Sequence, residues 1–258
     1  MARHFSVSSF SGNAPPEPPP KSGVRASRLL EVAGREAHAL AKQSTLFYRD
    51  VLEVVPEARP GDDVVVFVHG LFQTAGVLRP VRERIARETR AETASFSYAP
   101  GPGIVRIAER LGELMRELPN GVRIHLVGHS VGGLVVRWYV QELGRDERVV
   151  QTISLGSPFS GTTHARYFPM QVGRDIVPGS RLLARLAAGA RAGERVPHLS
   201  ITATHDSIVP NGAMLCAGDT LTIDGCGHNS LIYHGAVARE IVRRVRTIRA
   251  AAELCAGF

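Results

Sequence analysis

The sequence predicts an α/β domain in which a mostly parallel central sheet of about six strands is flanked by helices. Two observations favour this fold class. Short continuous apolar runs alternate with longer amphipathic stretches, which is typical of a parallel sheet covered on both faces. The chain also has 258 residues, of which 44% are hydrophobic, so it is long enough to bury a substantial core.

The apolar runs and the amphipathic stretches place the elements in order. We expect strands near residues 63–68, 93–97, 122–127, 149–155, 199–203 and 219–224. We expect helices between and after them, near residues 76–90, 103–118, 131–144, 181–190 and 234–250. Ahead of the first strand, residues 46–55 are the one candidate for a further strand.

The amino-terminal part differs in composition from the rest. Residues 1–25 contain many Pro, Ser and Gly residues, which predicts a disordered tail, and they lack the apolar core of a signal peptide. Residues 26–60 predict an amphipathic helix and a connection to a catalytic domain over residues 61–258. The helix, over residues 25–43, either packs on the core or touches an anionic membrane as a peripheral contact.

The segment Gly128 to Gly132, Gly-His-Ser-Val-Gly, decides most about function. It follows a predicted strand and precedes a predicted helix, which is the context of a nucleophile elbow. In so tight a turn the two glycines sit where only hydrogen fits. The strained backbone between them exposes the serine hydroxyl at the carboxyl edge of the sheet. Ser130 is therefore the candidate nucleophile.

A loop after the first strand supplies the candidate oxyanion hole. Residues 69–72, His-Gly-Leu-Phe, directly follow the buried run 63–68. In a fold of this kind one backbone N–H of the hole comes from such a loop, and the second comes from the residue after the nucleophile. We therefore expect the N–H groups of Leu71 and Val131 to stabilise an oxyanion.

The candidate acid is Asp206, which follows the predicted strand 199–203 at the same sheet edge. Such an aspartate can accept the Nδ1–H of a catalytic histidine and fix its tautomer. Asp175, Asp219 and Asp224 are the rivals, but none combines a strand end with a comfortable reach to the histidine.

The candidate base is His228, which stands in a glycine-rich loop after the last predicted strand. His205 and His234 are its competitors. The chain order of nucleophile, acid and base, Ser130, Asp206 and His228, matches that of α/β-hydrolases.

Together these motifs resemble an α/β-hydrolase of the small lipase or esterase type. The segments that match in order are Val68–Leu71, Gly128–Gly132, Leu155–Pro158 with Gly161–Thr162, Asp206–Pro210 and Gly227–His228. The resemblance implies the α/β-hydrolase fold and esterase or lipase activity without a cofactor. The chain shows no long helical lid segment, so we expect a minimal lid or none.

The expected activity is that of a serine carboxylic-ester hydrolase, which acts through an acyl-enzyme on an aliphatic, lipid-like ester. The apolar candidates for substrate binding are Phe72, Phe159, Ile208 and Leu231. The same triad would serve a thioesterase or an acyltransferase, because the pocket selects the leaving group and the acceptor. A non-catalytic binding protein is the remaining alternative, although binding alone does not require all three triad residues.

Charge and cysteine usage exclude other classes. The net charge is +7, but the arginines are dispersed and aromatics make up only 6%, so we expect no nucleic-acid partner. Cys216, Cys226 and Cys255 lack metal-ligand spacing, so we expect no metal. Cys216 and Cys226 could form a disulfide, although free thiols fit the missing export signal better. That missing signal also favours a cytoplasmic location, with secretion by another route left open, and the sequence indicates no oligomeric state.

Overall fold

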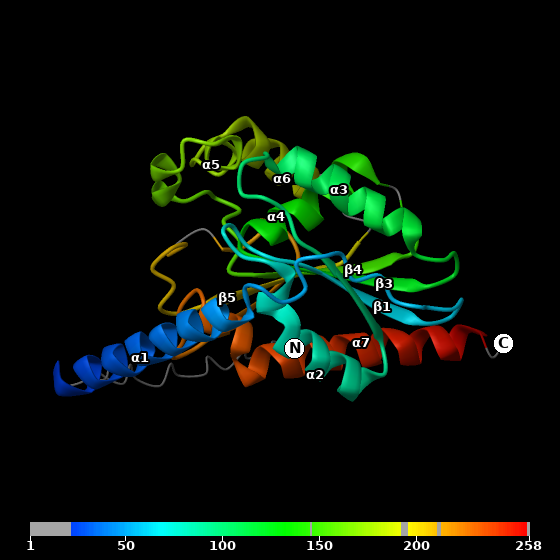
Figure 1. Ribbon diagram of the computed structural model, residues 1–258, viewed down its shortest axis with the longest axis horizontal. Helices are drawn as coiled ribbons and strands as arrows, with labels where there is room; N and C mark the ends of the chain where they lie inside the picture. The colour runs from blue at the N-terminus through cyan, green and yellow to red at the C-terminus, as the bar shows by residue number, and fades with distance from the viewer. Residues whose placement is uncertain (1–21, 145, 192–195, 211–212, 257–258) are drawn as a thin grey trace, which may run out of the picture.

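A parallel sheet lies at the centre of the structure. The computed structural model describes residues 22–144, 146–191, 196–210 and 213–256, and within these ranges it contains a six-stranded sheet in the order β2-β1-β3-β4-β5-β6 (Figure 1). Every neighbouring pair is parallel. The strands are Asp63–Val68 (β1), Glu92–Phe96 (β2), Arg123–His129 (β3), Val149–Leu155 (β4), His198–Ala203 (β5) and Asp219–Ile223 (β6). All the expected strands are therefore confirmed.

Helices surround the sheet as predicted. They are α1 (Ser22–Leu46), α2 (Arg79–Thr89), α3 (Ile104–Glu117), α4 (Val131–Trp138), α5 (Gln171–Asp175), α6 (Arg181–Arg191) and α7 (Gly235–Ala256). Short 3-10 helices are η1 (Ala75–Leu78), η3 (Thr163–Tyr167) and η4 (Ser230–Tyr233). The helix expected over residues 131–144 ends its α-helical part at Trp138 and continues as a π-helical turn, η2 (Tyr139–Leu143).

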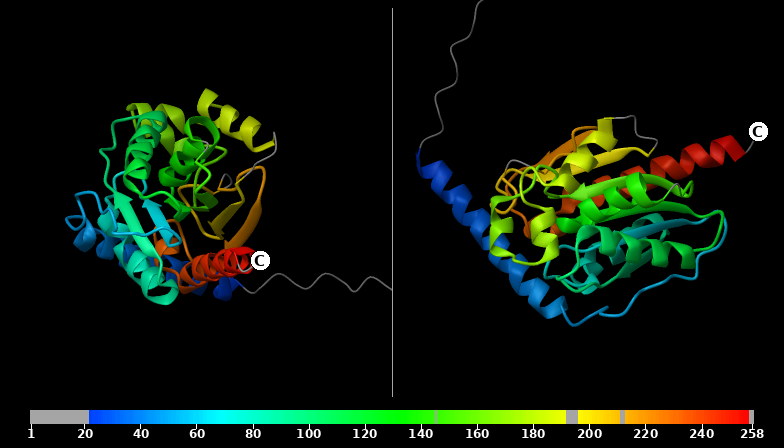
Figure 2. Two further views of the ribbon diagram at one scale, coloured as in Figure 1. Left: turned by 90° about the vertical axis from the view of Figure 1, so that its right-hand side faces the viewer. Right: turned by 90° about the horizontal axis from the view of Figure 1, so that it is seen from above.

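The sheet separates two layers of core. Alternate residues of β1 point to opposite faces: Val64, Val66 and Val68 pack with α3 and α4, whereas Val65 and Phe67 pack with α2 and α7. Figure 2 shows helices on both faces of the sheet. Every residue of β1 is buried. This two-sided burial explains why the strand reads as a continuous apolar run rather than as an alternating one.

A buried ion cluster joins the last helix to the sheet. Asp63, at the start of β1, accepts hydrogen bonds from Arg123 at 2.8 and 3.0 Å and from Arg249 of α7 at 2.5 Å. The Nε2 atom of His125 lies 3.1 Å from the same carboxylate. Burial raises the pKa of Asp63, but these hydrogen bonds outweigh burial and hold the pKa well below its usual value.

The further strand considered over residues 46–55 is wrong. The segment makes an isolated antiparallel bridge between Val54 and Ser95, at the edge strand β2. A turn at Asp50, where φ is +50°, breaks the extended path, and the Asp50 carboxylate binds Arg82 at 2.6 Å. The chain thus follows the sheet edge without adding a strand to it.

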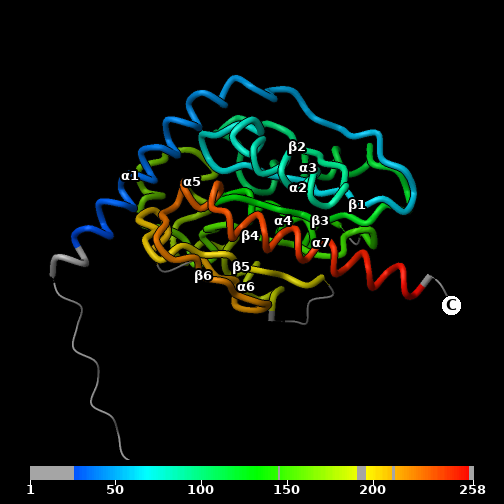
Figure 3. The backbone as a smooth tube through the Cα atoms, turned by 90° about the horizontal axis from the view of Figure 1, so that it is seen from below, coloured from blue at the N-terminus to red at the C-terminus, as the bar shows by residue number. Residues whose placement is uncertain are grey.

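Helix α1 contains the amphipathic stretch expected over residues 25–43, and it packs against the folded core. It contacts η1 and η4, and Val32, Ala39 and Gln43 are its buried residues (Figure 3). Residues 1–21 of the expected tail lie outside the described residues. Across the described ranges, no helix combines the length and the apolar character that crossing a bilayer requires. The cysteines Cys216, Cys226 and Cys255 are free thiols.

Candidate active site

Ser130 stands at a strained turn between β3 and α4. Its backbone has φ +53° and ψ −123°, a conformation that L-residues rarely adopt. A Cβ on Gly128 would lie 2.3 Å from the Gly132 carbonyl, and one on Gly132 would lie 2.1 Å from the Val68 carbonyl oxygen. Both glycines are therefore required by close backbone packing, as the sequence predicted.

The structure brings Asp206 and His228 together. Asp206 follows β5 and His228 follows β6, and His228 Nδ1 lies 2.7 Å from Asp206 Oδ2. Each residue is only 5% exposed. The carboxylate must accept this hydrogen bond, so the Nδ1 atom carries the proton and the Nε2 atom of a neutral ring is free to act as a base.

Asp206 is held as a carboxylate by its surroundings. Its Oδ1 atom accepts the backbone N–H groups of Ile208 at 2.9 Å and of Val209 at 2.7 Å. Burial raises the pKa of Asp206, but the hydrogen bond from His228 and those from the backbone outweigh burial and lower the pKa. Asp206 is therefore ionised at neutral pH and can orient His228.

The rival acids are engaged elsewhere. Asp175 accepts the N–H of Ile104 at 2.7 Å, at the start of α3. Asp219 pairs with Arg244 at the start of β6, and Asp224 accepts the Thr204 hydroxyl at 3.0 Å.

The competing histidines are also occupied by local contacts. The Nδ1 atom of His205 contacts the Thr204 hydroxyl at 2.8 Å, and that of His234 accepts the N–H of Ala236 at 3.3 Å near the start of α7.

The predicted oxyanion loop lies directly beside Ser130, the candidate nucleophile. A Cβ on Gly70 would lie 3.0 Å from the Ser130 Cβ atom, so the backbone that leads into Leu71 abuts the elbow. Val131 is the first residue of α4, where an α-helix leaves its backbone N–H groups without intrahelical partners. The loop ends in a tight turn at Phe72, where φ is +57°.

The family of the chain follows from a comparison with known proteins. The sequence model that describes palmitoyl protein thioesterase matches residues 49–189, more than half of the chain. The chain belongs to the palmitoyl protein thioesterase family. The matched part of this family member contains Ser130 and the oxyanion loop, whereas Asp206 and His228 lie beyond it. No curated protein sequence matches the chain.

Solved structures share the fold of this palmitoyl protein thioesterase family member. A mature lipase of Bacillus licheniformis superposes with a TM-score of 0.55 at 14% identity, covering 74% of this chain and 95% of that one. A Listeria innocua gene product gives a TM-score of 0.55 at 15% identity, covering 70% of this chain and 92% of that one. The mouse α/β-hydrolase domain-containing protein 10 gives a TM-score of 0.50 at 12% identity, covering 73% of this chain and 90% of that one. The fold is that of the α/β-hydrolases, and the family member is a hydrolase.

The predicted substrate residues of the hydrolase lie in different surroundings. Phe72 is 50% exposed and Ile208 is 36% exposed, so both are open to a ligand. Leu231 is fully buried in the core beside α7, and Phe159 is buried with its ring edge-on to His198 at 5.5 Å. Core packing covers Leu231 and Phe159 in this structure, and their contact with substrate stays a prediction.

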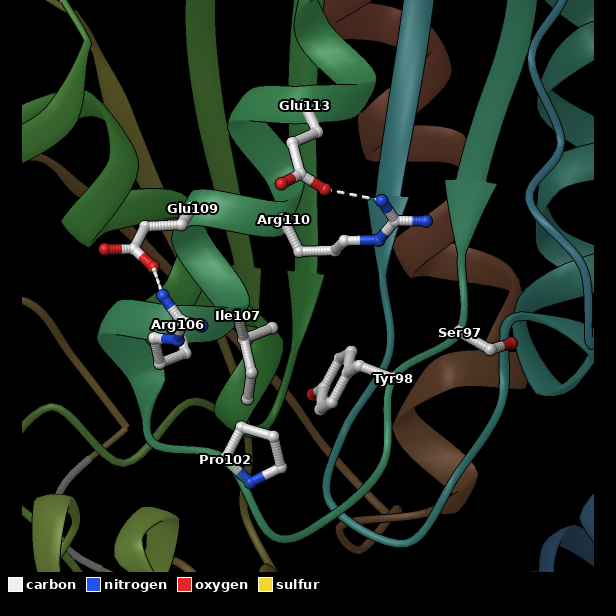
Figure 4. A pocket seen from close by; sticks show the side chains of 8 residues that line it. All are labelled: Ser97, Tyr98, Pro102, Arg106, Ile107, Glu109, Arg110 and Glu113. Atoms are coloured by element: carbon white, nitrogen blue, oxygen red, sulfur yellow. Dashed lines mark hydrogen bonds and ion pairs between the residues drawn. The ribbon is translucent and has the colours of Figure 1, made fainter.

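A pocket of about 340 Å³ opens between the end of β2 and the start of α3 (Figure 4). Its lining residues are Ser97, Tyr98, Pro102, Arg106, Ile107, Glu109, Arg110 and Glu113. The charged residues pair with one another, Arg106 with Glu109 at 2.9 Å and Arg110 with Glu113 at 2.5 Å. These four side chains are exposed, and none of the lining residues is one of the candidate triad residues.

Sequence reasoning missed Gln73 and the contacts of His129, which connect the parts of the site. The Oε1 atom of Gln73 accepts the N–H of Gly70 at 2.9 Å and lies 3.0 Å from His129 Nδ1. The Nε2 atom of His129 lies 3.2 Å from the His228 carbonyl oxygen. A neutral His129 has one ring N–H, so it donates to one of these two acceptors at a time.

Buried histidines next to the triad stay neutral. Burial, with a smaller contribution from the nearby His228, lowers the pKa of His129 to about 3, and burial lowers that of His69 to about 4. Neither ring therefore carries a positive charge at neutral pH. Within the part of the chain that the structure describes, no three His, Cys, Asp or Glu side chains gather in a way that could hold a metal ion.

Proposed function

We propose that this hydrolase cleaves esters of aliphatic, lipid-like acyl groups with Ser130 as nucleophile, His228 as base and Asp206 as the acid that orients it. The observation that supports this most strongly is the 2.7 Å contact between His228 Nδ1 and Asp206 Oδ2. It fixes the tautomer that general-base catalysis needs, on a loop at the same sheet edge as the strained serine.

The reaction is acyl transfer in two halves. The Nε2 atom of His228 takes the Ser130 proton while the hydroxyl oxygen attacks the ester carbonyl. The backbone N–H groups of Leu71 and Val131 stabilise the tetrahedral oxyanion, a contribution of about 3 kcal/mol for each donor in well-studied enzymes. His228 then protonates the leaving alcohol, and a water molecule activated by the same ring releases the acyl group.

Two aromatic residues beside the oxyanion loop, the exposed Phe72 and the partly buried Phe168, support an apolar acyl group. The rings of Phe72 and Phe168 lie 5.4 Å apart, so the segment between β4 and β5 meets the loop. Phe72 also lines a pocket of about 340 Å³ next to the end of α1. An aliphatic chain placed along this surface would remove apolar area from water.

A thioester is the second candidate substrate, favoured by the family match. A thiolate leaves more readily than an alkoxide, and the triad needs no change to accept it. The experiment compares p-nitrophenyl esters from acetate to palmitate with an S-palmitoyl thioester, in wild type and in Ser130→Ala.

We expect both activities to disappear in Ser130→Ala and a fluorophosphonate probe to label only the wild type. A wild type that is inert on every substrate and unlabelled would contradict the proposal and favour the binding-protein alternative. The lack of a nucleic-acid partner, the peripheral membrane contact through residues 25–43 and the cytoplasmic location stay predictions.

A further inference from the structure

Helix α1 precedes the part of the chain that the family model matches, yet it touches both loops of the candidate site. Its polar side chains reach the segment around His228 after β6 and, through Gln73, the oxyanion loop after β1. Figures 2 and 3 show the helix running along that end of the sheet. An element so placed can set the geometry of both loops, and the inference drawn from it rests on the proposed function.

Glu36 binds the loop immediately after the base. Its Oε1 atom accepts the backbone N–H of Ser230 at 2.7 Å. Its Oε2 atom accepts the backbone N–H of Asn229 at 3.0 Å and the Asn229 side-chain amide at 3.1 Å. Two consecutive amides next to His228 are thus held by one carboxylate, and hydrogen bonds to a charged acceptor are stronger than neutral ones.

The loop is shaped to admit this carboxylate. A Cβ on Gly227 would lie 2.8 to 2.9 Å from the Cγ, Cδ and Oε1 atoms of Glu36, so a larger residue before His228 would displace the side chain. One residue earlier on α1, Arg35 donates to the Gly225 carbonyl at 2.5 Å. Burial raises the pKa of Glu36, but the hydrogen bonds from Ser230 and Asn229 outweigh it and lower the pKa. Glu36 is therefore ionised while it binds the loop.

A second contact of α1 reaches the oxyanion side. Gln43 is buried, and its Nε2 atom donates to the Asn229 side-chain oxygen at 3.3 Å. Its Oε1 atom accepts from Gln73 Nε2 at 3.1 Å, and Gln73 in turn accepts the N–H of Gly70 at 2.9 Å. A continuous set of hydrogen bonds thus runs from the loop of the base to the loop of the oxyanion hole.

We propose that Glu36 is a positioning residue for catalysis, because it holds the Asn229 and Ser230 amides and thereby fixes His228 against Asp206 and the elbow. Glu36 does not touch substrate in this scheme. Its loss should therefore slow the chemical step, which depends on where the His228 ring lies, and should leave substrate affinity nearly unchanged.

The test measures kcat and KM on a p-nitrophenyl ester for Glu36→Ala and Glu36→Gln in the full chain. Glu31→Gln is the matched control, because Glu31 is an exposed carboxylate on the same helix whose contact is the pairing with Arg35 at 4.0 Å. We expect Glu36→Ala to lose about tenfold or more in kcat with KM within about twofold of wild type. Glu36→Gln, whose amide oxygen still accepts one N–H, should regain part of this loss.

The outcomes separate the two proposals. An inert wild type overturns the proposed function itself, whereas an active wild type that loses activity in Ser130→Ala upholds it. If the proposed function is upheld, a folded Glu36→Ala variant with the same kcat as Glu31→Gln overturns the positioning role of Glu36. A rise in KM at constant kcat overturns it as well. Thermal unfolding checks each variant, and if Glu36→Ala does not fold, the nearly isosteric Glu36→Gln decides by the same comparison of kcat.

Discussion

The substitution Asp206→Asn would test the proposed acid, because the two oxygens of Asp206 have different partners. Oδ1 accepts two backbone N–H groups, from Ile208 and Val209, and Oδ2 accepts the Nδ1–H of His228. In the asparagine variant, the amide oxygen should stay with the two backbone donors. The NH₂ group then faces Nδ1 and donates to it, which moves the ring proton to Nε2, where the ring cannot accept a proton from Ser130.

The cost can be worked from these contacts. Turning the amide to restore the productive tautomer would leave two backbone N–H groups without an acceptor, at about 1–3 kcal/mol each. The productive orientation is then disfavoured by about 2–6 kcal/mol, which corresponds to about 30-fold to about 10⁴-fold in population. We therefore expect kcat to fall by about 30-fold to about 10⁴-fold, and the upper end matches the loss of about 10⁴-fold for the equivalent change in a serine protease.

The assay is steady-state hydrolysis of a p-nitrophenyl ester, with thermal unfolding as a check on folding. Asp224→Asn is the matched control, because Asp224 follows the next strand but is exposed and binds Thr204 instead of His228. It should keep the wild-type kcat. The reasoning would be refuted if folded Asp206→Asn kept more than about a tenth of the wild-type kcat, or if Asp224→Asn lost as much.

Three further predictions concern packing, stability and specificity. Gly132→Ala should lower the free energy of unfolding, measured in urea, by at least about 3 kcal/mol, because its Cβ would meet the Val68 carbonyl oxygen at 2.1 Å. Gly34→Ala is the control: Gly34 lies on α1 with open space around it, so this variant should not lower the free energy of unfolding. Asp63→Asn should cost about 2 kcal/mol, since it removes the carboxylate to which the partly buried Arg123 and Arg249 donate hydrogen bonds. The pKa of Asp63 is lowered in the fold, so its stabilisation is present above pH about 4 and is lost as pH falls further; urea unfolding of the variant should show a flatter acid dependence than wild type. Phe168→Ala should raise KM for the palmitate ester about tenfold but leave the acetate ester unchanged, and equal effects on both esters would argue against an acyl-chain contact.

The sheet could be predicted from the sequence because burial on both faces leaves a local signal. Strand β1 reads as an unbroken apolar run, and each later strand is bounded by turn residues, so all the strands were placed correctly. The triad candidates followed from the same signal, since carboxyl ends of parallel strands meet at one sheet edge. The elbow glycines could also be predicted, because the strand-turn-helix context demands them.

Contacts between distant polar residues could not be predicted in the same way. Glu36 and Asn229 are 193 positions apart, and nothing in the helical periodicity of α1 distinguishes Glu36 from an exposed carboxylate such as Glu31. The strand considered over residues 46–55 failed for a related reason. Its apolar residues suggested a strand, but the Asp50 turn and the ion pair with Arg82 are tertiary features that redirect the chain.

The order of the strands explains a further requirement of the site. In the sheet, β4 lies between β3, which precedes Ser130, and β5, which precedes Asp206. The side chains of Asp206 and His228 must therefore meet close above the end of β4. The residue there is Gly156, with φ +58°, and a Cβ on it would lie 3.1 Å from Asp206 Oδ2 and 3.3 Å from His228 Nδ1. A glycine at this position is thus required twice, by its backbone conformation and by the space that the acid and base occupy.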